Sequence, residues 1–223
     1  MLNHTKKIKN IYEIIQKMIF YMIPEKWDKL YLYSSVIDKQ DGTQTGELYF
    51  YYIPKGIIRK KPVNVYEIPS KFNVDETEYL KLVKALYEKI KQLREQFRKS
   101  ETGSLWTNIT IIIENYKFKV EYNYEDLNDS RFNSYERHII FRYKYLDLPY
   151  SSYTKKEKKV VEEYLQEYRY NREMTKIYTE PMYESPFQTI KINSKDSNIR
   201  FVKEEEVKQM ENQRNIKNQI LKY

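Results

Sequence analysis

Residues 106–126 constrain the fold most, because they predict two β-strands joined by a tight turn. Residues 106–113 are rich in β-branched side chains, which pack well on a pleated sheet, and Asn115 tolerates the left-handed backbone of a turn. In the return strand apolar residues alternate with polar ones, so one face is dry and the other wet. The dry face consists of Phe118, Val120, Tyr122 and Tyr124. This hairpin is interpreted as core with a solvated face; the alternative is that residues 122–126 present acidic and aromatic groups to a partner.

The same periodicities predict the rest of an α+β domain. Helices are expected at residues 5–22, 75–99 and 135–146, where apolar side chains recur every three or four positions. Asp75 with Glu78 predicts an N-terminal cap for the second helix, whose apolar stripe is Leu80, Val83, Leu86, Tyr87, Ile90, Leu93 and Phe97. Further strands are expected at 30–37, 48–53 and 63–68, and the second is apolar on both faces, as in a central strand. The order α-β-β-β-α-β-β-α predicts an antiparallel sheet of about five strands packed by helices.

The residue pattern changes after residue 150, where charged residues become more frequent. We expect the α+β domain at residues 1–150 and a charged helical extension at 151–223. The extension is predicted to contain a helix at about 154–172, a linker with two prolines at 179–186, a small hairpin at 187–202 and a polar helix at 203–223. The apolar face of that last helix is thin, so we expect it to fray unless it packs against a partner.

Composition excludes several kinds of site. The chain has no cysteine, so disulfides, thiol nucleophiles and thiolate metal sites are excluded, and its two histidines are too few for a multi-histidine metal site. Its four glycines form no phosphate-binding loop. Glu125 and Asp126 with Asp129, and His138 in a predicted helix, are interpreted as solvated or structural groups. We therefore expect no catalytic residue, no metal site and no cofactor.

Hydropathy predicts a protein without a membrane span. No apolar run approaches the ~20 residues that cross a bilayer. Three lysines precede an apolar stretch near the N-terminus, but Glu13 and Lys17 interrupt that stretch, so it does not form a signal peptide. The expected location is the cytoplasm, which also suits a chain without cysteine.

The net charge of +8 leaves a second class of function open. A basic protein can bind nucleic acid through phosphate contacts, but such proteins usually gather their charge on one face or helix. Here the basic residues are spread along the chain, and the run at 155–159 is interpreted as a solvated surface. Tyrosine is abundant at 24 residues, and it suits interfaces because its ring packs while its hydroxyl stays wet.

An ordered set of short stretches resembles the YezG-type immunity proteins, which are antitoxins of type VII-secreted LXG nuclease toxins in Gram-positive bacteria. The set runs from about residue 8 to 165 and consists of MIPEKW at 22–27, GELYFYY at 46–52, IPSKFNV at 68–74, WTN at 106–108, FKVEYNY at 118–124, ER at 136–137 and RYKY at 142–145. The resemblance implies a cytoplasmic, non-catalytic protein that binds and blocks the C-terminal domain of a cognate nuclease toxin. This chain departs from the expected pattern in being basic and in extending past about residue 170.

The contact residues expected for that role combine local acidity with aromatic density. They lie in the loop from residue 38 to 47 and at the end of the hairpin, and they are Asp38, Asp41, Glu47, Tyr122, Tyr124, Glu125 and Asp126. Carboxylates there would compete with substrate phosphates for the toxin, and tyrosines would anchor the contact. Two alternatives stay open: a basic protein that binds nucleic acid or regulates, and an orphan homologue that has lost its toxin.

Overall fold

The structure is a computed structural model of the 223-residue chain. The residues it describes are 2–56, 61–99, 105–114, 117–170, 178–179 and 183–184. The predicted turn at Asn115, the hairpin at 187–202 and the helix at 203–223 lie outside these residues. None of the helices in the described ranges combines the length and hydrophobicity needed to cross a membrane.

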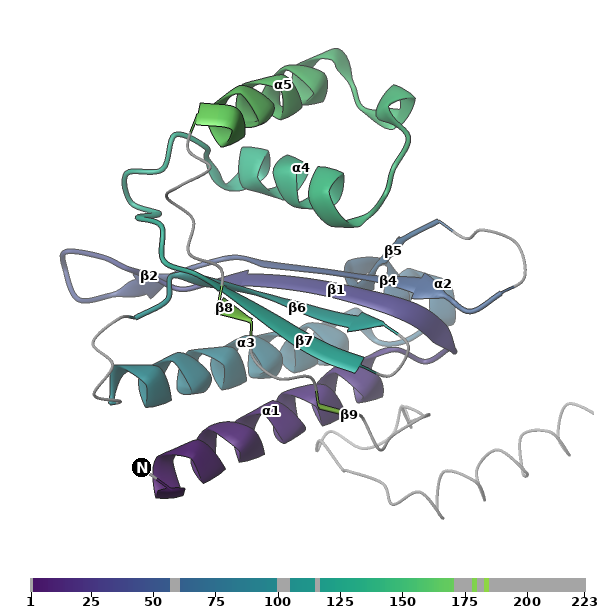
Figure 1. The fold of residues 1–223 in the computed structure, drawn as a ribbon. Helices are drawn as coiled ribbons and strands as arrows, with labels where there is room; N and C mark the ends of the chain where they lie inside the picture. The colour runs from purple at the N-terminus through teal and green to yellow at the C-terminus, as the bar shows by residue number, and fades with distance from the viewer. Residues whose placement is uncertain are drawn as a thin grey trace, which may run out of the picture.

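One antiparallel sheet organises the fold, with its strands in the spatial order β5-β4-β1-β6-β7-β8 and with β9 also paired to β7 (Figure 1). The long strands are β1 (Trp27–Ser35), β4 (Leu48–Pro54), β6 (Asn108–Glu114) and β7 (Lys117–Asn123). The short strands are β5 (Val63–Asn64), β8 (Tyr178–Thr179) and β9 (Tyr183–Glu184), while β2 (Ile37–Asp38) and β3 (Gln44–Thr45) form a separate hairpin. The predicted α+β class, with helices packed on an antiparallel sheet, is confirmed.

The strand predicted to be a central one, β4, has a paired neighbour on each side. β1 lies between β4 and β6 along its length, whereas β4 has only the two-residue β5 on its other side, paired through Tyr51 and Tyr52. β4 is apolar on both faces because helices cover both faces of the sheet. Phe50 and Tyr52 enter the core under one layer, and Tyr51 packs under the other.

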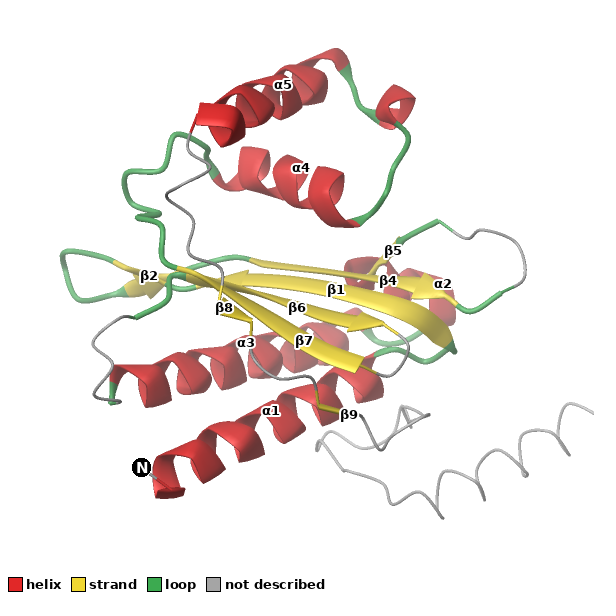
Figure 2. Ribbon diagram, viewed as in Figure 1, coloured by secondary structure: helices red, strands yellow, loops and turns green. Residues whose placement is uncertain are grey.

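Two long helices cover one face of the sheet, and two others lie on the opposite side (Figure 2). The first pair is α1 (Leu2–Met22) and α3 (Glu76–Arg98), which contact each other. Inward residues of all four long strands join this core, among them Leu32, Phe50, Ile111 and Val120. The predicted cap is confirmed, since Asp75 accepts a hydrogen bond from the Glu78 amide at 2.8 Å.

The apolar stripe of α3 is shifted from its predicted position at one residue. Leu80 was assigned to the buried stripe, but it is 43% exposed, and its neighbour Tyr79 is fully buried instead. The Tyr79 hydroxyl reaches the Met22 carbonyl at 3.2 Å, where α1 ends. The tertiary packing of α1 against α3 therefore selects the longer side chain for the first buried turn.

The second layer consists of α4 (Ser134–Tyr145) and α5 (Lys155–Tyr170). α4 packs on aromatic residues of β1 and β4 through Phe141, whose ring lies 5.9–6.2 Å from those of Tyr33, Tyr49 and Tyr51. α5 packs on α4 through Val161. The core on one face of the sheet therefore mixes aliphatic and aromatic side chains, whereas the smaller cluster on the other face is mostly aromatic.

Two predicted segments differ in the structure. Residues 63–68 were expected to form one strand, but β5 ends at Asn64, and a 3₁₀ turn η1 (Val65–Glu67) and helix α2 (Ile68–Phe72) follow. The Asn64 side chain accepts a hydrogen bond from the Tyr66 amide at 3.2 Å, and Pro69 favours the first turn of a helix. The linker predicted at 179–186 is not a linker throughout, because Thr179 lies in β8 and residues 183–184 form β9.

Candidate partner-binding surface

The two segments predicted to contact a partner meet at one end of the sheet. The β2–β3 hairpin projects there after β1 (Figure 1), and the end of β7 lies beside it. The Val36 amide donates to the Thr107 carbonyl at 2.8 Å, and the Thr107 amide donates to the Asn123 carbonyl at 2.9 Å. The Asn128 side chain then donates to the Asp38 carbonyl at 3.2 Å. The loops at 36–47 and 123–128 are therefore fastened to each other.

Asp38 is the first predicted contact residue, and two arginines of α3 hold it. Arg94 donates to its carboxylate at 2.8 Å and Arg98 at 3.3 Å, and Gln44 donates at 2.9 Å. The hydrogen bond from Arg94 is the main reason that the pKa of Asp38 is lowered to about 2. Arg94 is itself buried and also donates to the Trp106 carbonyl at 2.7 Å. Asp38 therefore ties the hairpin to α3.

Glu47 is held in the same way from the other layer. Asn133 and Glu136 form a capping box that begins α4, and this places Arg137 in a two-point ion pair with Glu47. The side chains are only 14% and 9% exposed, for Arg137 and Glu47 respectively. Burial alone would raise the pKa of Glu47, but hydrogen bonds from Arg137 and Tyr49 outweigh it and lower that pKa. Glu47 is therefore a structural carboxylate.

Asp41 occupies the exposed tip of the hairpin. Its carboxylate accepts hydrogen bonds from the Thr43 amide at 2.9 Å and the Thr43 hydroxyl at 2.6 Å, and these lower its pKa. Gly42 follows with a φ of 81°, a conformation that glycine adopts without steric cost. Local bonds thus fix the tip, and Asp41 has no arginine partner among the described residues.

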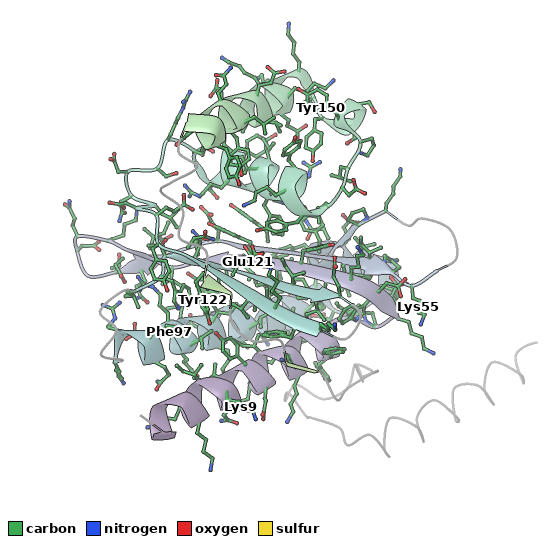
Figure 3. The ribbon with its side chains drawn as sticks, viewed as in Figure 1. Lys9, Lys55, Phe97, Glu121, Tyr122 and Tyr150 are labelled. Atoms are coloured by element: carbon green, nitrogen blue, oxygen red, sulfur yellow. The ribbon has the colours of Figure 1, made fainter. Side chains whose placement is uncertain are left out.

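The end of β7 splits into buried and exposed residues. Tyr122 is only 1% exposed, and its ring lies 5.1 Å from that of Phe97 on α3. Figure 3 shows it on the opposite side of the sheet from Glu121, whose carboxylate accepts a hydrogen bond from Tyr145 of α4 at 2.9 Å. Tyr122 is therefore a core residue that supports the surface from within.

The residues after β7 lead out of the core. Tyr124 is partly buried against that core. Glu125 and Asp126 are exposed; Glu125 accepts a hydrogen bond from buried Asn108 at 2.9 Å, and Asp126 accepts one from the Asn128 amide at 2.9 Å. In the part of the chain that the structure describes, neither carboxylate forms an ion pair, although Lys144 interacts electrostatically with Glu125.

Sequence reasoning missed the arginines that neutralise Asp38 and Glu47, as well as one exposed aromatic ring. Tyr135, in the first turn of α4, is 62% exposed. It lies four residues before buried Ile139, a spacing that predicts burial, so no local signal identifies it. The pairs Arg94–Asp38 and Arg137–Glu47 are 56 and 90 residues apart in sequence, and only the fold brings them together.

His138, the one histidine considered as a possible catalytic group, has a structural role. His138 is stacked on Tyr49 with ring centroids 4.4 Å apart, and its Nε2 lies 2.8 Å from the Tyr51 hydroxyl. Burial and nearby Arg142 lower its pKa, so the neutral imidazole is favoured inside this cluster. Within the described ranges no group of three or more histidine and carboxylate side chains is arranged to hold a metal ion.

Comparisons with known proteins place this fold in a family. A family model described as "Immunity protein YezG-like" matches residues 8–161. The chain is 32% identical to the immunity protein YezG of Bacillus spizizenii over 165 residues, which is 74% of this chain and 94% of that protein. It is 30% identical to YezG of Bacillus subtilis, over 63% of this chain and 89% of that protein.

A third relative comes from another genus. The type VII secretion system protein EsaG of Staphylococcus aureus is 30% identical over 165 residues, which is 73% of this chain and 96% of that protein. The family match runs from within α1 to the first half of α5, and it includes both layers of helices and the surface at the end of the sheet. This chain belongs to the YezG-like immunity protein family.

Proposed function

We propose that this chain is a cytoplasmic, non-catalytic antitoxin that binds the C-terminal nuclease domain of a cognate LXG toxin and covers its active-site face. The single observation that carries the proposal is the set of exposed carboxylates on the fastened loops, formed by Asp41, Glu125 and Asp126. Among the described residues none of these groups forms an ion pair, although Lys39 interacts electrostatically with Asp41 and Lys144 with Glu125. The chain as a whole carries a charge of +8. A nuclease binds phosphates with cationic groups, which such carboxylates complement.

The surrounding structure supports a preorganised contact. Asp38 and Glu47 are already neutralised by arginines, so their part is to hold the loops rather than to meet the toxin. Tyr122 supports this surface from within the core, and the partly buried Tyr124 supplies aromatic area next to Glu125. Loops fixed before binding lose less entropy in the complex, which favours tight association.

The test is co-expression with the C-terminal domain of the toxin encoded beside this chain, followed by co-purification, titration and a nuclease assay. We expect a stable complex without nuclease activity. The triple variant Asp41→Asn, Glu125→Gln, Asp126→Asn should weaken binding at least about tenfold. Asp28→Asn is the matched control, because Asp28 is an exposed carboxylate at the other end of β1.

A second candidate is a nucleic-acid-binding protein, and one observation favours it. Lys155, Lys156 and Lys159 are exposed on α5, in a chain of charge +8. This candidate predicts retention on heparin and a DNA or RNA affinity that falls steeply with salt. A complex with the toxin domain that persists at physiological salt excludes it as the main function. If the chain formed no complex with the toxin domain and bound no nucleic acid, it would be identified as an orphan homologue.

A further inference from the structure

Leu80, an apolar residue of α3 that is not buried in the core, indicates a second contact surface. Leu80 of α3 and Tyr66 of η1 are each 43% exposed, and both line a shallow hollow of about 290 Å³ between α3 and the edge of β4. The hollow is lined by Gly46, Glu47, Leu48, Tyr66, Leu80, Val83, Lys84 and Tyr87, and it is called the α3–β4 hollow below. Exposed apolar groups gathered in one place are typical of a contact site.

The hollow exists because β5 is so short. β5 pairs with β4 only at Tyr51 and Tyr52, so no described strand covers Leu48 on that side. Two tyrosines form fixed walls instead. The Tyr66 hydroxyl donates to the Leu48 carbonyl at 3.4 Å, and the Tyr87 hydroxyl donates to the Ser35 carbonyl at 3.1 Å. Rings held at their hydroxyl ends lose little freedom on binding.

The rim of the hollow carries one uncompensated positive charge. Lys84 is exposed and makes no ion pair with any residue that the structure describes, whereas nearby Lys81 is paired with Glu78 at 2.6 Å. Glu47, the carboxylate of the lining, is already paired with Arg137. An occupant that matches the hollow therefore brings apolar area together with a negative charge.

The size of the hollow favours a protein segment as its occupant. Small-molecule pockets usually enclose ~300–1,000 Å³, and this hollow is at the lower limit and open to solvent. It accommodates one bulky side chain with its neighbours rather than a cofactor. Gly46 and Glu47 also join it to the β2–β3 hairpin, so it adjoins the surface of exposed carboxylates.

We propose that the α3–β4 hollow docks a segment of the toxin that carries a bulky apolar side chain next to a carboxylate. This inference rests on the proposed function and identifies where the toxin is anchored. Cationic groups of the toxin meet Asp41, Glu125 and Asp126, while its acidic apolar segment meets Leu80, Tyr66 and Lys84. Two adjoining contacts of opposite charge fix the orientation of the complex, which is how electrostatic complementarity gives specificity.

The first test is titration of the full chain with the C-terminal domain of the adjacent toxin. We expect Leu80→Ala, Tyr66→Ala and Lys84→Glu each to weaken binding at least about tenfold, as anchor residues do when truncated or reversed. The matched controls are Tyr168→Ala and Lys156→Glu, exposed residues of the same types on α5, which should change the affinity less than about twofold.

The second test is a footprint that does not depend on affinity changes. Because the chain has no cysteine, Leu80→Cys introduces a single thiol at the hollow, and Tyr168→Cys introduces one at a control position. Saturating toxin domain should slow alkylation at position 80 at least about tenfold and leave position 168 unchanged, because the buried centre of an interface excludes solvent. Mass spectrometry of peptides from this chain measures both rates.

The outcomes separate the two proposals. If the wild-type chain binds but the three hollow variants match their controls and position 80 stays reactive, the docking inference is overturned and the antitoxin proposal stands. If the wild-type chain does not bind the toxin domain at all, both are overturned. Binding that is lost selectively in the hollow variants, with protection at position 80, supports both.

Discussion

At the residue scale, arginine pairing decides what each predicted contact carboxylate does. Asp38 and Glu47 lie in a loop whose residues are mostly exposed or half-buried, so the sequence gives no sign of a partner. In the fold, however, Arg94 neutralises Asp38 and Arg137 neutralises Glu47. Asp41, Glu125 and Asp126 keep their charges for solvent or a partner. Removing one member of a buried pair costs more than removing an exposed charge, because it leaves the other member uncompensated. Stability and binding should therefore respond to different carboxylates.

Asp38 should give stability a measurable pH dependence. Its pKa is about 2 in the folded chain, against an ordinary value of 3.8, because of the hydrogen bond from Arg94. A lowered carboxyl pKa stabilises the fold above the ordinary value, and that contribution is lost as the pH falls toward the folded value. Asp38→Asn should therefore be less stable than the wild type near neutral pH, and the difference should shrink between about pH 3.8 and 2. Urea unfolding across this range measures it, and a constant difference would contradict the assignment.

Gly46 should be the least replaceable glycine of the described surface. A Cβ at this position would lie 2.0 Å from the Ser35 carbonyl oxygen and 2.2 Å from the Tyr87 hydroxyl. The Ser35 atom belongs to the backbone, so Gly46→Ala should lower the free energy of unfolding by at least about 3 kcal/mol, at the upper end for overpacking. Gly42→Ala is the control, since its Cβ meets nothing within 4 Å and its positive φ costs only ~1 kcal/mol. Equal effects in denaturant titrations would show that the close approach at Gly46 relaxes freely.

At the scale of elements, the ring of Phe141 lies at the centre of the contact between the second layer of helices and the sheet. Phe141 is 3% exposed, and besides the tyrosines of the sheet it contacts Tyr145 of its own helix at 5.2 Å. The outer helix α5 packs on α4, through Val161 and the ion pair of Arg142 with Glu157 at 2.9 Å. The position of both helices is therefore set where α4 meets β1 and β4.

Phe141→Ala should loosen α4 and α5 while the layer of α1 and α3 stays folded. Truncating a buried phenylalanine costs ~3–5 kcal/mol, and here the loss falls on a single contact zone. Hydrogen exchange should show lost protection in α4 and α5 and retained protection in β1 and β6. Tyr135→Ala on the same helix is the control and should change stability less than ~0.5 kcal/mol, because that ring is exposed. Uniform loss of protection would instead mean that the two layers unfold as one unit.

At the scale of the whole molecule, the functional unit is proposed to end within the described part of the chain. The family match covers residues 8–161, and both helix layers are complete by residue 170. A fragment of residues 1–170 should keep its affinity for the toxin domain within about twofold and its melting temperature within a few degrees, because β8 and β9 add only two-residue pairings to β7. Titration and calorimetry of the fragment beside the full chain measure both. A large loss of affinity would assign binding to residues 171–223.

Much of the fold follows from local patterns. The β6–β7 hairpin was predicted from alternation, and Phe118, Val120 and Tyr122 are buried on the predicted face. The cap at Asp75 was predicted from residue types three positions apart. Such signals can be read from sequence because strand alternation, helical periodicity and capping act between residues within a few positions of each other.

The sequence by itself determined most of the elements and the α+β class, and it pointed to the two loops that are proposed as the contact surface. Only the tertiary structure decided that those loops are fastened together, that Asp38 and Glu47 belong to arginines 56 and 90 residues away, and that Leu80 lies outside while Tyr79 lies inside. The physical reason is the distance along the chain over which each interaction acts. Charge pairing and burial depend on neighbours in space, and those neighbours come from distant parts of the chain only after strands and helices have packed.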